Sequence, residues 1–311
     1  MESTLPTGVR TAQGILSFRE IHEHFSATSY GRTLAENIRW RLFKPPEVSH
    51  AEWEQLLGPD VNNLEHHWVS VRVMRAFLRG NTDFSREEQE ILLLTAVSHD
   101  WAEAIIGDIP YGRKTNDEEE DELRLIPEIA LECFGEEVAQ AVRQTIERVL
   151  REKPHLRRTG EGTKLGHAFE AVEQLGYLGT AGRGWDEAAK RDGLSPVLRG
   201  NLQWMGIGVY AGHLPILLRY AAYPAVRRYL LGTRHRITNV LGGYIPSSCP
   251  PEGALSKTRE KIEQLVSETR VMWEKWLQGH TWSPEPSGSS AGRCSFGIHR
   301  TSESPDGEGR K

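Results

Sequence analysis

The sequence predicts an all-α protein, on the evidence of its hydrophobic spacing, its helix-capping signals and its lack of strand-like patterns. Apolar residues recur at helical spacing through most of the 311 residues, whereas the alternation typical of strands is hard to find. Two capping boxes, Ser49 with Glu52 and Ser85 with Glu88, mark helix N-termini. Pro45-Pro46 ends an N-terminal helical region, because proline cannot continue a helix. We therefore expect a helical bundle.

The expected elements follow one another along the chain. Residues 1–14 look like a loose leader, and the Gly-rich segment 180–185 predicts a turn. Residues 196–231 are rich in aromatic side chains and predict buried helices, with a break near 204–218 where glycines and a proline gather. The other periodic segments predict helices over 17–40, 49–57, 63–78, 91–106, 117 onward, 135–152, 164–178 and 256–277.

These elements suggest four parts. We expect an N-terminal helical extension over 1–45 and a catalytic core over 46–195. Residues 196–278 predict additional helices that either pack on the core or form a dimer surface. The segment 279–311 is rich in Ser, Gly, Pro and charge, so it buries too little apolar surface to offset ordering entropy, and we expect a disordered tail.

Composition and charge argue against several functional classes of protein. The net charge of −5 and the short basic patches give no reason to expect nucleic-acid binding. No run approaches 18 uncharged apolar residues, and the N-terminus lacks the pattern of a signal peptide, so we expect a cytoplasmic protein without a membrane span. The three cysteines are isolated and support neither a disulfide framework nor a zinc knuckle: Cys133, Cys249 and Cys294.

The most informative stretch is His-Asp-Trp-Ala-Glu-Ala-Ile-Ile-Gly-Asp-Ile-Pro, residues 99–110. Glu103 follows His99 by four residues and Asp100 by three, and these spacings bring the three side chains towards one end of one helix face. Burying them together is costly unless something compensates, and a divalent cation bound by imidazole and carboxylate would do so. Asp108 could reach the same opening from the loop after Gly107.

This stretch resembles the HD-domain phosphohydrolases, and within them the 5′-deoxynucleotidase-like branch. The resemblance covers about residues 60–180 and implies a lone upstream histidine, then His-Asp, then a distal Asp, all on one divalent metal. With His67 as the upstream ligand, the following apolar positions of the family pattern are Val71, Val73 and Met74. With His66 they become the less suitable Ser70, Arg72 and Val73, so we prefer His67 and give His66 a supporting or surface role.

The fourth ligand departs from the family pattern. The helix beginning Lys164-Leu165-Gly166-His167 resembles the family's Lys-x-x-Asp helix, and His167 stands where the Asp is expected. Three readings stay open: His167 ligates in place of Asp, a carboxylate elsewhere such as Asp186 does so, or the site is degenerate. Our expected ligand set is His67, His99, Asp100 and His167, a set that favours Co, Mn, Fe or Zn over Mg.

The resemblance also implies the activity: hydrolysis of a phosphate ester, with a (deoxy)nucleoside 5′-monophosphate as the expected substrate. Glu103 and Asp108 would be catalytic, while Arg39, Trp40 and Lys114 would contact the substrate. One rival is an HD-fold di-iron oxygenase, for which His155 and His213 are candidate extra ligands. Another is a catalytically degenerate module that binds a nucleotide or a protein. A homodimer is a further expectation, because the Trp-rich helix at 256–277 suits either a dimer surface or intramolecular packing.

Overall fold

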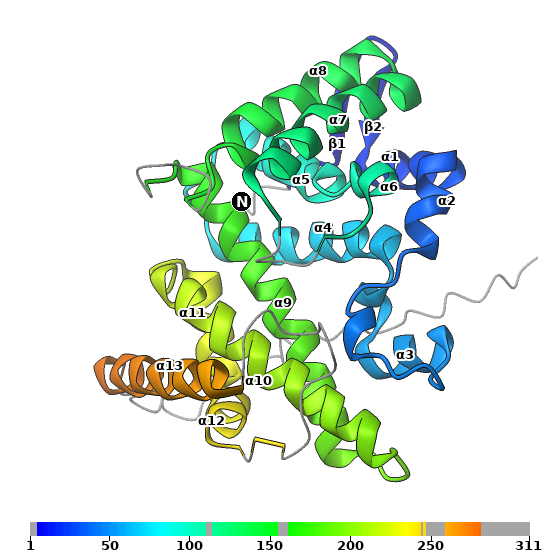
Figure 1. Ribbon diagram of the computed structural model, residues 1–311. Coiled ribbons are helices and arrows are strands. Elements are labelled where there is room, and N and C mark those ends of the chain that lie inside the picture. Colours follow the sequence, from blue (N-terminus) through cyan, green and yellow to red (C-terminus); the bar gives the residue numbers. More distant parts are fainter. Residues whose placement is uncertain (1–4, 110–113, 155–160, 244, 247–258, 281–311) are drawn as a thin grey trace, which may run out of the picture. The chain divides into compact units, whose positions relative to one another are not determined.

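The structure is a computed structural model that describes residues 5–109, 114–154, 161–243, 245–246 and 259–280 (Figure 1). The chain divides into two units, residues 1–280 and 281–311. The expected disordered tail therefore lies, from residue 281 onward, outside the described residues. The elements below all belong to the first unit.

Helices dominate this unit, which confirms the predicted all-α class. They are α1 Phe18–Ala27, α2 Ser29–Glu36, α3 His50–Leu57, α4 Asn63–Gly80, α5 Arg86–Ser98, α6 Glu103–Ile106, α7 Asn116–Phe134, α8 Glu136–Thr145, α9 Lys164–Lys190, α10 Pro196–Arg219, α11 Pro224–Gly232, α12 Arg234–Gly242 and α13 Arg259–Gly279. Three short helical turns join them: η1 Arg41–Phe43, η2 Pro59–Val61 and the π-helical η3 Ile146–Leu150. The capping boxes at Ser49 and Ser85 are both present, with their side chains bonded as the sequence predicts.

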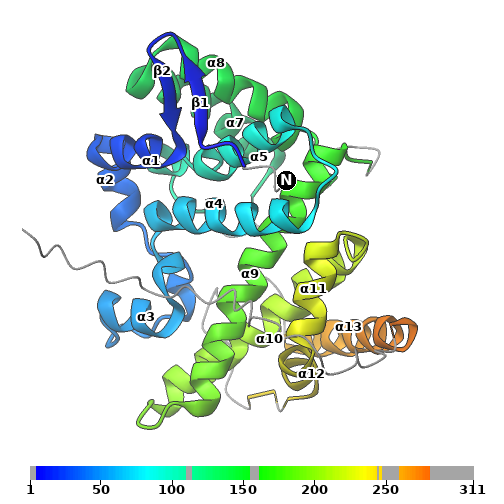
Figure 2. The ribbon, with the colours of Figure 1, turned by 180° about the vertical axis from the view of Figure 1, so that it is seen from behind.

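The N-terminus differs from the loose leader that we expected. Residues Gly8–Thr11 (β1) and Gly14–Ser17 (β2) form an antiparallel hairpin, the only sheet among the described residues. Gly14 has φ +131°, a conformation that side-chain-bearing residues rarely adopt, and it lets the chain reverse at residues 11–14. The hairpin packs on α1, α5 and α8 (Figure 2).

Helix α9 is the central helix of the unit (Figure 1). It contacts α4, α5 and η3 near its beginning, and it packs on α10 and α3 further along. The segment 180–185, expected to be a turn, is helical within α9. Its glycines serve close packing instead: a Cβ at Gly184 would lie 2.5 Å from Met205 Cε, and one at Gly182 2.6 Å from Tyr210 Oη.

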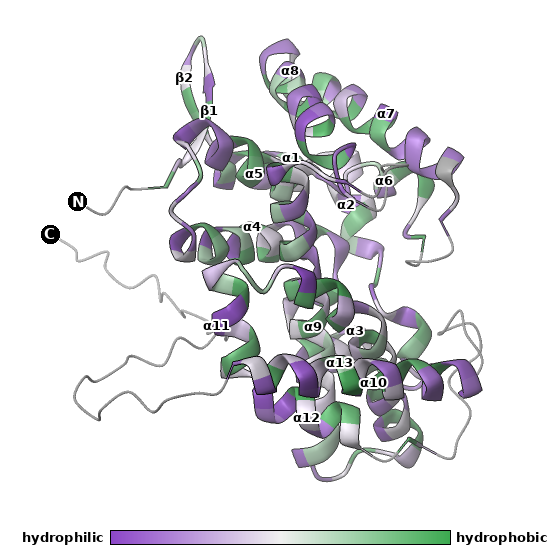
Figure 3. Cartoon of the chain, turned by 90° about the vertical axis from the view of Figure 1, so that its left-hand side faces the viewer, coloured by the Kyte–Doolittle hydropathy of each residue, from purple (hydrophilic) through white to green (hydrophobic). Residues whose placement is uncertain are grey.

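Helix α10 is also continuous where the sequence predicted a break, and it carries Pro215 in its interior. Helices α12 and α13 pack on α10, and α13 buries Ile262, Val266, Thr269 and Trp273. The apolar side of α13 is thus used within the chain, while the dimer stays a prediction. Helices at the edge of the unit, such as α7 and α8, carry both hydrophilic and hydrophobic residues, as one-sided burial requires (Figure 3).

The predicted helix over 91–106 is interrupted. Helix α5 ends at Ser98, residues 99–102 form a tight turn, and α6 begins at Glu103. The turn carries Trp101 into the core, where its ring stacks on Phe25 with centroids 4.7 Å apart. In the described part of the chain, no helix is both long and apolar enough to cross a membrane.

Candidate metal centre

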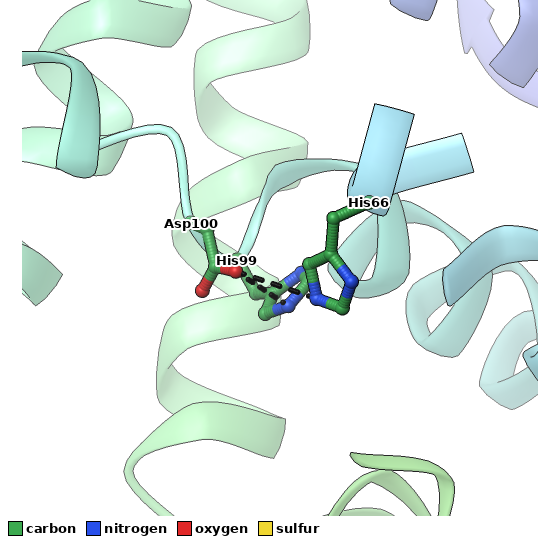
Figure 4. Close-up of side chains that lie close together, drawn as sticks. All are labelled: His66, His99 and Asp100. Carbon is green, nitrogen blue, oxygen red and sulfur yellow. Dashed lines mark ion pairs between the residues drawn. The ribbon is translucent and has the colours of Figure 1, made fainter. Parts of the chain in front are cut away.

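The end of α5 and the first turn of α4 bring together two imidazoles and a carboxylate. The potential ligand atoms of His66, His99 and Asp100 all lie within 4.8 Å of one another (Figure 4). Asp100 Oδ2 is 3.1 Å from His99 Nε2 and 3.5 Å from His66 Nε2. Both histidines are 9% exposed, so the group lies at the edge of the core.

Local structure explains this convergence. Asn62 caps α4, accepting hydrogen bonds from the backbone N–H groups of Leu64 and Glu65, so His66 comes in the first turn of that helix. His99 is the C-cap of α5, and its N–H donates to the carbonyl of Thr95. Trp101, which follows in the turn, is buried in the core, and Asp100 lies beside the rings of His66 and His99.

The structure differs from the sequence-based expectation in which of the two upstream histidines lies with His99 and Asp100. His66, the register that we thought less suitable, belongs to the donor group, and His67 does not. Adjacent helical residues point about 100° apart, so only one of the pair can face Asp100 directly. His67 is fully buried beneath the site, with its ring centroid 6.0 Å from that of His99 and no hydrogen-bond partner for either nitrogen.

His167 likewise does not belong to the donor group. Its ring lies near Tyr220, with centroids 5.7 Å apart. Helix α9 instead presents Phe169, Glu173 and Tyr177 to the cavity that His66 and His99 line, at the four-residue spacing of one helix face. His167 precedes Phe169 by two residues and so points to another side of the helix.

The other residues weighed as extra ligands also lie elsewhere. Asp186 accepts a hydrogen bond from Arg236 at 2.7 Å. His213 Nδ1 lies 2.7 Å from Gln174 Oε1. His155 is outside the described residues. Of the five described residues that were candidates for the metal beyond the His-Asp pair, only His66 joins the donor group.

Two neighbouring carboxyl groups have opposite pKa shifts. Burial and the charges of Asp100 and Asp108 hold the pKa of Glu103 well above its ordinary value. Burial opposes ionisation of Asp100 too, but the charges and hydrogen bonding of the neighbouring histidines hold its pKa well below the usual range. Glu103 also accepts a hydrogen bond of 2.6 Å from Asn63 Nδ2. Their environments thus favour the protonated form of Glu103 and the ionised form of Asp100.

The residues expected to contact the substrate lie in the neighbourhood of this centre. The charges of Arg39 and Lys114 both interact with that of Asp100, and Trp40 contacts Tyr177, which lines the cavity. Arg39 is nearly buried, with Nη1 3.9 Å from Asp60 Oδ1 and the guanidinium 6.0 Å from the Tyr177 ring centroid. Trp40 meets Tyr177 edge-on at 6.1 Å and is the only non-glycine residue of the described chain with positive φ, at 61°. Such strained backbone occurs often at functional sites.

Lys114 and Asp108 lie on either side of the segment 110–113, which is outside the described residues. Lys114 Nζ is 2.5 Å from Glu122 Oε2. Burial alone would lower the pKa of Lys114, but the charge of Glu122 outweighs it and raises that pKa, so the ammonium stays charged. Asp108 is half-buried and raises the pKa of Glu103 through its charge.

Sequence reasoning missed several residues of the site. Asp60 accepts a hydrogen bond from the His66 ring at 2.6 Å, and Asn63 holds Glu103. Glu173 and Tyr177 line the cavity from α9. The sequence did contain a signal for Glu173 and Tyr177, because they are four residues apart in a helix that was already expected to supply a ligand. None existed for Asp60, whose partners are separated from it by as many as 120 residues.

The donor set suits a divalent metal. Burial and the charge of Arg39 lower the pKa of His66, so its imidazole is neutral, as a ligand must be. The other ring nitrogen of His66, Nδ1, faces the carboxylate of Asp60. Metal-binding histidines usually have such a partner for the nitrogen that does not bind the metal. His99 Nδ1 is buried without a hydrogen-bond partner. No protein-family model, curated protein or solved structure matches this chain.

Proposed function

We propose that this protein is a metal-dependent hydrolase that releases phosphate from a phosphate ester, related to the HD-type enzymes that its His-Asp motif resembles. The observation that carries the proposal is a two-histidine, one-aspartate donor group with the buried carboxyl of Glu103 beside it, whose pKa is raised by burial and by the charges of Asp100 and Asp108. Two carboxyl groups whose environments separate their pKa values are typical of acid–base catalysis. The nucleoside 5′-monophosphate is the substrate expected from the resemblance.

His66, His99 and Asp100 would hold one divalent cation. The cation would polarise a phosphoryl oxygen and make a nearby water more acidic. Two imidazoles and one carboxylate favour Co²⁺, Mn²⁺, Fe²⁺ or Zn²⁺ over Mg²⁺, which prefers oxygen ligands. Glu173 lines the same cavity and is the carboxylate of α9 best placed to complete the set. It is held by an ion pair of 3.2 Å with Lys153.

Glu103 would move the proton. Its raised pKa favours the protonated carboxyl, which would donate its proton to the ester oxygen as the phosphorus–oxygen bond breaks. It then accepts the proton that the attacking water loses, so that an alcohol and inorganic phosphate are formed and the carboxyl returns to its first state. Asn63 keeps the carboxyl in place through its hydrogen bond.

The cations and aromatic rings around the centre would bind the substrate. Arg39 and Lys114 supply positive charge for a phosphate group. Trp40 and Tyr177 form an aromatic corner on the Arg39 side, suited to the planar base of a nucleotide. Trp40 Nε1 is buried without a hydrogen-bond partner and could donate to a bound molecule.

One observation favours a second candidate, a module that binds a nucleotide without catalysis. Phe169 packs against His99, with ring centroids 5.3 Å apart, on the helix from which the family resemblance expects a carboxylate ligand. Such a site would bind metal weakly or not at all. The di-iron oxygenase gains no such support from the described residues near the donor group.

The experiment is a phosphate-release screen over nucleoside mono-, di- and triphosphates with Co²⁺, Mn²⁺, Fe²⁺, Zn²⁺ and Mg²⁺. Glu103→Gln should keep its metal but lose about 10²–10⁴-fold in turnover, as expected for loss of a general acid. Glu147→Gln, at an exposed position of η3, is the matched control and should behave as wild type. Nucleotide binding without any phosphate release would favour the second candidate.

A further inference from the structure

We propose that Asp60 is a positioning residue, which orients the His66 ring so that its Nε2 faces the metal. The inference rests on the proposed metal site but adds a residue that the His-Asp motif does not include. It concerns how the ligand is held rather than which reaction follows.

The contacts of Asp60 use both of its oxygens. Oδ1 lies 2.6 Å from His66 Nδ1, and Oδ2 accepts a hydrogen bond from the Thr180 hydroxyl. Arg39 Nη1 lies 3.9 Å from Oδ1 and compensates the buried charge. Because an ionised carboxylate only accepts hydrogen bonds, the hydrogen of the His66 ring lies on Nδ1. Nε2 then carries the lone pair and points to the side of Asp100, 3.5 Å away.

A purely structural role accounts less well for this arrangement. Asp60 is 2% exposed, and burying a carboxylate is costly. It does not cap α4, since Asn62 already accepts the backbone N–H groups of that helix. Nor is a carboxylate required to hold Thr180, whose hydroxyl could donate to a neutral acceptor. A role as hydrogen-bond partner of the His66 ring explains both why residue 60 is a carboxylate and why it is buried beside that ring.

Asp60 also connects the site to two segments that are distant in the sequence. It lies in η2. This turn and the start of α4 are tied to residues 37–39 by the hydrogen bonds Arg39 N–H to Val61 carbonyl and Asn63 N–H to Asn37 carbonyl, of 2.8 and 3.1 Å. Thr180 contributes the link to α9. The orientation of His66 therefore depends on the docking of α9 and of the N-terminal segment, and removal of either link should loosen the metal site.

The test is a titration of the full chain with Co²⁺, followed by its visible absorption spectrum, on wild type, Asp60→Asn and Thr180→Val. Outer partners of metal-binding histidines typically contribute about 10–100-fold in affinity, so Asp60→Asn should weaken Co²⁺ binding by that factor and alter the spectrum. Thr180→Val should weaken it to a smaller degree. Thr145→Val is the matched control, because Thr145 is also buried but donates to the carbonyl of Val142 away from the site. It should bind Co²⁺ as wild type does.

Melting curves show whether each variant is folded. Wild-type affinity and spectrum in folded Asp60→Asn would overturn the assignment while leaving the metal site intact. If Asp60→Asn does not fold, Thr180→Val decides, and affinity equal to that of Thr145→Val overturns the assignment. Failure of the wild type to bind any of the five cations of the phosphate-release screen would overturn the proposed function and this assignment together.

Discussion

Neighbouring histidines on one helix differ here in what they can do. His66 faces the donor group and has a carboxylate behind it, whereas His67 faces the core, near Phe25 and His99. The difference follows from the turn of about 100° between adjacent helical residues. Burial lowers the pKa of His67 well below its ordinary value, so this ring is neutral and adds no charge to the core.

His66→Ala should therefore lower the affinity for Co²⁺ by more than about 100-fold, since it removes a direct ligand instead of an outer partner. His67→Ala should lower the melting temperature, because it leaves a cavity, but should retain most of the metal affinity. His167→Ala is the control and should bind Co²⁺ as wild type does. Isothermal titration of the three variants checks the order, and loss of binding in His67→Ala alone would restore the register first expected from the sequence.

At the scale of elements, helix ends and helix contacts set the geometry around the site. The capping box Ser85–Glu88 begins α5, whose C-cap is His99, and Lys164 of α9 donates a hydrogen bond of 3.1 Å to Glu88 Oε2. A single carboxylate thus both caps α5 and links it to α9. Gly166, two residues further along α9, faces the backbone of Glu152, which follows η3.

The link through Glu88 should make stability depend on pH. Partial burial would raise the pKa of Glu88, but the Ser85 backbone N–H and Lys164 outweigh it and lower that pKa. A lowered pKa in the folded state stabilises the fold above the ordinary value of 4.5, and this stability is lost as pH falls through the folded value. Glu88→Gln should reduce the loss between pH 6 and pH 3 in urea-unfolding experiments, by about 1 kcal/mol or less.

Glu52→Gln is the matched control for that experiment, since Glu52 closes the equivalent box on α3 without bonding to a distant helix. Its effect on the pH dependence should be smaller. Equal effects of the two variants would show that Lys164 adds nothing to the link.

Two glycines of α9 should respond in opposite directions to alanine. A Cβ at Gly166 would lie 2.0 Å from the backbone carbonyl oxygen of Glu152, so Gly166→Ala should destabilise the protein by about 1–3 kcal/mol. Gly179 has open space at the same position, and Gly179→Ala should stabilise α9 by about 0.5–1 kcal/mol. Urea unfolding measures both, and a stabilising Gly166→Ala would mean that α9 does not approach Glu152 so closely.

At the scale of the whole molecule, residues 1–280 form one compact unit that includes the C-terminal helices. Helix α13 contributes a buried Trp273, whose Nε1 donates to Thr238 Oγ1, and Thr269, whose hydroxyl donates to the carbonyl of Ala211. These contacts tie α13 to α12 and α10. The additional helices expected over 196–278 thus share their core with the rest of the unit, because α10 packs along α9.

Two truncated chains should show whether the tail or α13 contributes to the stability of the fold. A chain ending at residue 280 should melt within a few degrees of the full chain and bind Co²⁺ equally, because the packed helices are all retained. A chain ending at residue 258 loses α13 and exposes the surfaces of α10 and α12, so it should melt at a clearly lower temperature or aggregate. Differential scanning calorimetry compares them, and a strongly destabilised chain of 280 residues would show that the tail contributes to the fold.

Helix periodicity and helix caps are local properties, and the sequence was sufficient to predict them. The all-α class, the helix starts at Ser49 and Ser85, and the proximity of His99 and Asp100 all depend on residues within a few positions of each other. The Gly-rich stretch of α9 was wrongly predicted to be a turn. Its glycines pack closely against Met205 and Tyr210 of a later helix, and such a contact cannot be read from neighbouring residues.

What the sequence alone left open depends on contacts across the fold. Which of His66 and His67 lies beside Asp100 depends on how α4 packs near the end of α5, and the position of His167 near Tyr220 depends on the rotation of α9. Asp60 joins the site through partners at positions 66 and 180. The sequence determined which side chains were available for a metal site, whereas tertiary packing decided which of them meet, because a helix presents each side chain in one direction only.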